Sequence, residues 1–127
     1  LTYNPKLTYE GDYKEVGGRN GLEQLLNSKQ PFTAVVCAND EMASGAMTFA
    51  REHQISIPKD LSVIGFDNII LAQYIYPKLT TIDYPINQMG QMAARWIIKN
   101  TFKQADLEVI NVFEPKLIMR HSIGFID

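Results

Sequence analysis

Apolar residues recur at two different spacings in the first half of the chain. Residues 17–26 and 40–53 place apolar side chains three and four positions apart, which is the period of an amphipathic helix. Residues 32–38 and 61–66 are short and almost continuously apolar, a pattern typical of strands buried in a parallel sheet. The β-prone residues 7–9 precede the first helix. The predicted order is strand, helix, strand, helix, strand.

This alternation predicts an α/β fold. Strands that alternate with helices join through right-handed crossovers into a parallel, doubly wound sheet with helices on both faces. In the second half, residues 69–76 are apolar and aromatic without a period, and residues 79–82 favour a strand. Residues 86–102 have helical spacing, and residues 109–113 are β-prone before a break at Pro115.

Composition and charge narrow the possible partners. The chain has 127 residues and a formal net charge of −2, and no cluster of Lys and Arg. It therefore lacks the basic surface with which a domain holds a phosphate backbone, so we do not expect this segment itself to contact DNA. No apolar run approaches the roughly 20 residues of a membrane helix, so no membrane partner is expected. The single cysteine, Cys37, lies in an apolar run and fits a reduced core residue in a cytoplasmic protein.

Polar and aromatic side chains follow three predicted strands. Asp12 and Tyr13 follow the first, Asn39 and Asp40 the second, and Asp67 with its neighbour Asn68 the third. The carboxyl ends of parallel strands meet at one edge of a sheet, where α/β proteins bind their ligands. An aromatic face, an amide and carboxylates together suit a polyhydroxylated small molecule.

Each of these residues also has a structural explanation. Asn39 and Asp40 are typical N-cap residues, so capping and ligand contact fit either one equally, and we expect one to cap and the other to bind. Asp67 fits a simple turn and Tyr13 fits a half-buried loop aromatic.

The sequence offers no motif of an enzyme. It contains no dinucleotide-binding glycine motif, no P-loop, no nucleophile-elbow motif and no Cys-x-x-Cys pair. His53 and His121 are isolated and lack partners at metal-ligand spacing, so surface or helix-end positions are expected for them. We therefore predict no enzymatic activity, no cofactor and no metal. A third possible function, that of a small flavodoxin-like enzyme, would require a phosphate-binding loop that this sequence does not contain.

Four segments, in order and with matching spacing, resemble the LacI/GalR family of sugar-responsive bacterial repressors. They are residues 38–46, 57–67, 77–82 and 120–122. The resemblance covers nearly the whole chain. Residues 81–86, 111–113 and 120–122 look most similar to galactose-operon repressors, which makes galactose a candidate effector.

The resemblance implies a domain of two lobes of the periplasmic-binding-protein type, with the sugar effector between them and a DNA-binding headpiece before them. Residues 1–83 and 116–127 would belong to the C-terminal lobe. Residues 84–115 would form the crossover and a helix packed on the N-terminal lobe. The headpiece is absent from this chain, so operator DNA would be contacted only through that other part of the protein.

The resemblance also implies roles for single residues. Tyr13 matches an aromatic residue that stacks on the effector, and Asn39 and Asp67 match residues that hydrogen-bond its hydroxyls. Four further residues lie at or beside contact positions, namely Asp12, Phe66, Tyr84 and Ile86. The loop at residues 14–18 departs from the Ser-Gly common in relatives, so the local fit to a ligand differs there.

The resemblance further implies a homodimer or higher oligomer. The helix that begins near Asp40 and the segment at residues 69–76 would form part of its interface. The residues expected in that interface are Met42, Met47, Tyr74 and Tyr76.

The alternative function is that of a periplasmic sugar-binding protein of a transporter, which shares the lobe architecture. Residues 77–81 and the apolar interface favour the regulator, because transport receptors act as monomers. An apolar helix at residues 86–102 without a covering lobe would be adhesive, so we expect the chain to be a portion of a longer regulator or to self-associate.

Overall fold

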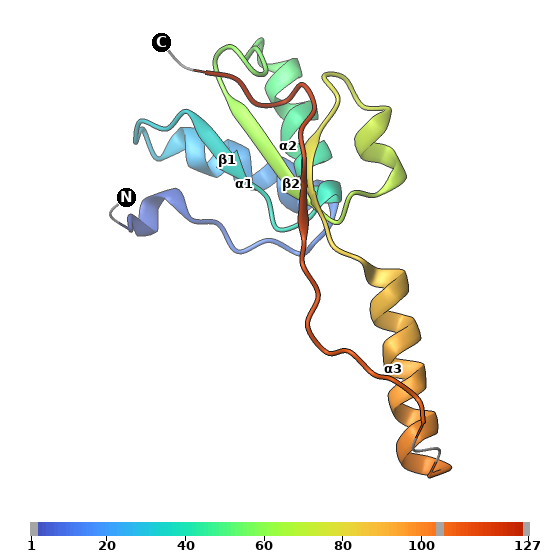
Figure 1. Cartoon of the computed structure of the whole chain (residues 1–127). Helices are drawn as coiled ribbons and strands as arrows, with labels where there is room; N and C mark the ends of the chain where they lie inside the picture. Colours follow the sequence, from blue (N-terminus) through green and yellow to red (C-terminus); the bar gives the residue numbers. More distant parts are fainter. Residues whose placement is uncertain (1–2, 104–105, 126–127) are drawn as a thin grey trace.

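The computed structural model describes residues 3–103 and 106–125. In chain order its elements are η1 (Pro5–Leu7), α1 (Glu15–Asn27), β1 (Ala34–Val36), α2 (Asp40–Glu52), β2 (Ser62–Phe66), η2 (Ile70–Gln73), β3 (Thr80–Asp83), α3 (Ile86–Thr101) and β4 (Lys116–Ile118), where η denotes a 3-10 helix. Figure 1 shows α1, α2 and the sheet packed together, whereas α3 extends away from the lower end of the sheet. Among the described residues, no helix combines the length and the apolar character needed to span a membrane.

The predicted α/β fold is confirmed, and its sheet is parallel over three strands with a fourth, antiparallel strand added. The strand order is β1-β2-β3-β4. β1, β2 and β3 are parallel, and β4 is antiparallel to β3. The reversal follows from the path of the chain, because β3 leads out of the sheet into α3 and β4 returns beside it (Figure 1).

Both packed helices cover the same face of the sheet. Val35 and Val63 lie side by side in register and pack into one cluster with Leu22 of α1 and Met42 of α2. Figure 1 likewise shows α1 and α2 on one side of the strands. The expected helices on both faces are therefore not found within the described residues. Val36, on the opposite face of β1, is 81% exposed, so residues 32–38 are not a strand buried on both sides.

Two predicted strands are wrong. Residues 7–9 include the end of η1, which Asn4 caps by accepting a hydrogen bond from the Lys6 backbone N–H, and then continue without regular structure. This segment and β1 both line a hollow of about 550 Å³, and the four-stranded sheet of the described residues does not include residues 7–9. Residues 109–113 are also irregular, and the strand expected there lies at β4 instead. β-prone residues form a strand only where a neighbour supplies ladder hydrogen bonds.

The core lies between α1, α2 and the sheet. Gly18 and Gly45 let the two helices cross closely, since a Cβ at Gly18 would lie 1.8 Å from the Met42 carbonyl oxygen. Cys37 is buried in this core, as predicted, and burial followed by the charge of Asp40 raises the pKa of its thiol to about 12. The thiol is therefore protonated and inert at neutral pH.

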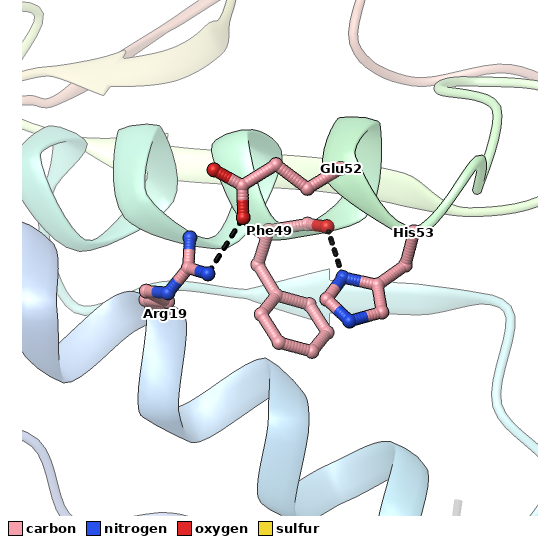
Figure 2. A network of polar contacts seen from close by, with 4 residues as sticks. All are labelled: Arg19, Phe49, Glu52 and His53. Carbon is pink, nitrogen blue, oxygen red and sulfur yellow. Dashed lines mark hydrogen bonds and ion pairs between the residues drawn. The ribbon is translucent and has the colours of Figure 1, made fainter.

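The outer side of the α1–α2 pair is closed by a small polar and aromatic cluster (Figure 2). Arg19 of α1 pairs with Glu52 of α2 at 2.6 Å and lies over the Phe49 ring, 5.4 Å from its centroid. His53 stacks on Phe49 with centroids 3.9 Å apart, and its Nδ1 lies 2.9 Å from the Phe49 carbonyl oxygen. His53 is also the C-cap of α2, which confirms its expected helix-end position.

The helix predicted at residues 86–102 is confirmed as α3. Met92 is its one buried residue among those described. Its large apolar side chains are instead exposed: Ile86, Met89, Trp96, Ile97 and Ile98. The segment that returns from α3 runs beside it, where Lys99 Nζ donates to the Leu107 carbonyl oxygen at 3.0 Å.

Candidate functional site

The carboxyl ends of the three parallel strands meet at the edge of the sheet from which α3 departs (Figure 1). The N-terminal segment reaches the same edge, although no strand precedes it. Asn39, after β1, donates through Nδ2 to the backbone oxygen of Tyr13 at 2.8 Å. The structure therefore brings Tyr13 and Asn39 together, as the sequence predicted.

Asn39 has a structural role in addition to its place at this edge. Its Oδ1 accepts from the Met42 backbone N–H at 2.8 Å and caps α2. Counting donors and lone pairs, the half-buried amide retains one N–H and one acceptor position after both bonds. Capping and ligand contact are therefore compatible in this one side chain.

Tyr13 is held in a sharp turn that leaves its ring in the open. Its φ is 63° and its side chain is 66% exposed. Asp12 Oδ1 accepts from the Lys14 backbone N–H at 3.0 Å and turns the chain into α1. Residues 15–18 of the expected loop instead form the first turn of α1, where a Cβ at Gly17 would lie 2.0 Å from that oxygen, so glycine leaves room there for the Asp12 carboxylate. Asp12 thus orients the turn, and the Tyr13 face is free to stack.

Asp67 and Asn68 form a turn with left-handed backbone at both positions, φ 111° and 54°. The Asp67 backbone N–H donates to the Ile82 carbonyl oxygen at 2.9 Å, which fixes the turn against β3. Burial, followed by the charges of Asp40 and Glu41, raises the pKa of the Asp67 carboxyl. Asp40, the first residue of α2, accepts from the Ile69 backbone N–H at 2.9 Å, so the turn that carries Asp67 lies beside the helix start that Asn39 caps.

The side chains of this turn have different surroundings. Asn68 is held by the protein, because its Oδ1 accepts from Arg120 at 2.6 Å and its Nδ2 donates to Asp83 at 3.3 Å. For the Asp67 carboxylate, no hydrogen-bond donor is found among residues 3–103 and 106–125. The turn predicted as the structural alternative is therefore present.

Neutralising Glu41 is expected to lower the pKa of Asp67, because one of the two negative charges that disfavour its ionised form is then removed. Glu41→Gln is compared with Glu23→Gln, which alters an exposed carboxylate on α1. The carboxyl carbon of Asp67 is titrated by NMR in each variant. An identical Asp67 titration in the unaltered chain and in Glu41→Gln would contradict this placement.

Three further predicted residues line the β2 and β3 side of the edge. The rings of Phe66 and Tyr84 lie 5.3 Å apart between centroids, with an angle of 32°. Ile86 follows at the start of α3 and is 60% exposed. Phe66 and Tyr84 therefore form an aromatic surface where the chain leaves the sheet.

Asp40 does not bind at the surface, which corrects the expectation that one of Asn39 and Asp40 caps while the other binds. Asp40 is 1% exposed, and it accepts from Thr81 Oγ1 at 2.5 Å and from the Ile69 backbone N–H at 2.9 Å. Burial raises the pKa of its carboxyl, against the lowering effect of these hydrogen bonds and of Arg120. No local pattern marks this role, because both partners are distant in sequence.

The residues expected at a dimer interface separate into two groups. Met42 and Met47 are 8% and 5% exposed and belong to the core, so their prediction as partner contacts is corrected. Tyr74 and Tyr76 are 79% and 86% exposed around η2. These two aromatics are accessible to a partner.

The sheet with its edge site, and the two passages of chain to and from α3, define a lobe of the periplasmic-binding-protein type. The chain belongs to the periplasmic binding protein-like domain family, whose family model matches residues 3–123. The curated relatives and solved structures that this chain matches confirm the resemblance to LacI/GalR regulators.

Two curated relatives illustrate this. The chain is 39% identical over 124 residues to the HTH-type transcriptional regulator GalR of Escherichia coli K12, covering 98% of this chain and 36% of the relative. It is 42% identical over 115 residues to the HTH-type transcriptional repressor PurR of Photorhabdus laumondii, covering 90% and 33%. The chain thus spans about a third of their length. These relatives are named as regulators rather than as enzymes.

Solved structures agree. A sugar-binding LacI-family regulator from Escherichia coli, complexed with phosphate, superposes with a TM-score of 0.90 at 35% identity, over 97% of this chain and 44% of that one. The regulator CelR in complex with cellobiose superposes with a TM-score of 0.88 at 27% identity, over 96% and 37%.

Proposed function

We propose that the chain is the C-terminal portion of the effector-binding domain of a sugar-responsive transcriptional repressor. The observation that carries this is the group of Tyr13, Asn39 and Asp67 at one sheet edge. Asn39 donates a hydrogen bond to the Tyr13 backbone oxygen, and the turn of Asp67 is joined to Asp40 at the start of α2 through the Ile69 backbone N–H. The aromatic ring would stack on the C–H face of a sugar, and the amide and carboxylate would hold its hydroxyls. The CelR structure, which holds cellobiose, supports a sugar effector.

In this proposal, residues 1–83 and 116–127 form one lobe and residues 84–115 cross to the other. The sugar binds between the lobes and closes them by rotation at the two crossings, which changes how paired DNA-binding headpieces sit on an operator. No bond is made or broken. Tyr74 and Tyr76 contact the second subunit, and the whole regulator acts in the cytoplasm.

The exposed apolar side of α3 supports this division. Trp96 and Ile97 are 58% and 54% exposed, and other large apolar side chains of the same helix are exposed with them. A contiguous exposed apolar surface of this kind is typical of a contact with another part of a protein. In the proposal they pack on the N-terminal lobe. A transporter receptor shares the lobe architecture, but the relatives named as HTH-type regulators favour the repressor.

The isolated 127-residue chain is expected to self-associate through α3, because burying these side chains removes apolar surface from water. Replacing both Trp96 and Ile97 with glutamate should reduce the association. The matched control is Arg95→Glu, which adds negative charge to the same helix without removing an apolar side chain. Sedimentation velocity at several protein concentrations measures the association. An unaltered chain that stays monomeric at all of them would contradict the prediction.

A panel of sugars tests the function on the full-length regulator. D-galactose and D-glucose, which differ in the orientation of one hydroxyl, are compared by calorimetry and by operator binding. We expect one sugar of the panel to bind and to change operator affinity. Binding without any change in operator affinity would favour the transporter receptor, and no binding by any sugar would reject the proposal.

A further inference from the structure

A buried carboxylate lies directly behind the candidate site. Asp40 is the first residue of α2 and is 1% exposed. Its Oδ1 accepts from the hydroxyl of Thr81 on β3 at 2.5 Å, and its Oδ2 accepts from the Ile69 backbone N–H at 2.9 Å. One carboxylate therefore joins a helix start, the neighbouring strand β3 and the residue that follows the Asp67 turn.

The hydroxyl of Thr81 extends this link into the turn itself. Because it donates its proton to Asp40, it is left as an acceptor, and the Asn68 backbone N–H lies 3.4 Å from it. The turn is thereby held at two successive backbone N–H groups, those of Asn68 and Ile69. Two consecutive non-glycine residues with positive φ are costly, so such a turn persists only where its surroundings hold it.

The packing around Asp40 leaves space for a carboxylate. A Cβ at Gly65 would lie 2.2 Å from Asp40 Oδ1, and Gly65 is the register partner of Thr81 across the β2–β3 pair. Glycine on one strand and threonine on the next thus form one recess with a hydroxyl donor in it. A larger residue at position 65 would displace Asp40.

The far side of the turn is held independently. Arg120 donates through Nη2 to Asn68 Oδ1 at 2.6 Å and through Nη1 to the Leu79 carbonyl oxygen at 2.7 Å. Asn68 is therefore fixed from the C-terminal segment, whereas the backbone at Ile69 is fixed from α2. The end that Asp40 holds leads directly into η2, which the exposed residues Tyr74 and Tyr76 follow.

We propose that Asp40 is a positioning residue that acts through Thr81 and Ile69 to hold the turn presenting Asp67 at the site. It does not touch the ligand. Its effect on ligand binding rests on the proposed function, whereas its hold on the turn does not. The same contacts connect the start of α2, capped by Asn39, to the η2 segment.

Hydrogen exchange of backbone amides in the full 127-residue chain tests the hold on the turn. Thr81→Val removes the hydroxyl with little change of shape, and Thr81→Ser retains it. We expect the Ile69 amide to exchange at least about tenfold faster in Thr81→Val, beyond any change at the Cys37 amide, which bonds to the Ile64 carbonyl oxygen at 2.9 Å in the sheet. Thr81→Ser should restore slow exchange. Equal acceleration at Ile69 and Cys37 would indicate general destabilisation only and overturn the proposal.

Calorimetry with D-galactose on the full-length regulator tests the consequence for binding. We expect Thr81→Val to weaken binding about tenfold and Thr81→Ser to stay within about twofold of the unaltered protein. Unchanged affinity in Thr81→Val would overturn the positioning role. If the unaltered protein binds no sugar of the panel while Ile69 responds as expected, the proposed function fails and the hold on the turn stands.

Discussion

Replacing Gly18 with alanine is expected to destabilise the domain by about 3 kcal/mol or more, at the upper end of overpacking effects. The added Cβ would lie 1.8 Å from the carbonyl oxygen of Met42 and within 3 Å of two further backbone atoms of that residue. Backbone cannot move aside as a side chain can, so α1 and α2 must separate. The free energy of unfolding, measured by urea denaturation, should therefore fall by about 3 kcal/mol or more, which is a substantial fraction of the roughly 5–15 kcal/mol typical of domains.

Two variants sharpen this prediction. Gly45→Ala meets the same crossing from the other side, because its Cβ would lie 1.9 Å from the Glu15 carbonyl oxygen, so combining the two should cost less than the sum of their separate effects. Gly90→Ala is the matched control, since nothing lies within 4 Å of its Cβ. It should leave the urea midpoint unchanged or raise it slightly through better helix propensity. A Gly18→Ala chain with the unaltered midpoint would disprove the close crossing.

The helices were predictable because their signals are local. Asn39, followed by apolar residues at helical spacing, predicted the start of α2. The helix ends at Glu52, one residue before the predicted limit. The same period predicted α3 to within one residue. Capping and periodicity act over one or two turns of chain, so they can be read without knowledge of the tertiary neighbours.

Strands were less predictable because a strand depends on its partner. Residues 109–113 are more β-prone than Lys116–Ile118, yet only the latter lie opposite β3, where Ile82 pairs with Leu117. The register is decided by where the chain returns after α3, which no local pattern encodes. For the same reason the direction of β4 could not be inferred from its residues.

The candidate site was predictable only in its outline. Asn39 and Asp67 follow from the rule that ligands lie at the carboxyl ends of parallel strands, whereas Tyr13 reaches this edge without the strand from which it was predicted. Asp40 resembles a cap in sequence, and its burial depends on the hydroxyl of Thr81, which becomes its neighbour only after folding. Adjacent polar residues can thus have opposite surroundings, which composition alone does not distinguish.

The candidate site makes its largest quantitative prediction at Asp67. A hydrogen bond to a charged group contributes about 1.5–3 kcal/mol, which corresponds to roughly 10–100-fold in affinity. In the full-length regulator, Asp67→Asn keeps an acceptor and removes the charge, so sugar binding should weaken about 10-fold. Asp67→Gly removes both and should weaken it about 100-fold. Both replacements tolerate the positive φ of 111° better than alanine does, so backbone strain adds little.

The pH dependence separates a ligand contact from a structural effect. Because burial and the nearby acids raise the pKa of Asp67, its carboxylate becomes protonated at a higher pH than an ordinary aspartate on acidification. Sugar affinity should therefore fall as the pH decreases through this raised pKa, and Asp67→Asn should remove that part of the dependence. Calorimetry across pH measures this, with Glu23→Gln, an exposed carboxylate on α1, as the control that keeps it. Equal affinity and an equal pH profile in Asp67→Asn and the unaltered protein would show that this carboxylate does not hold the effector.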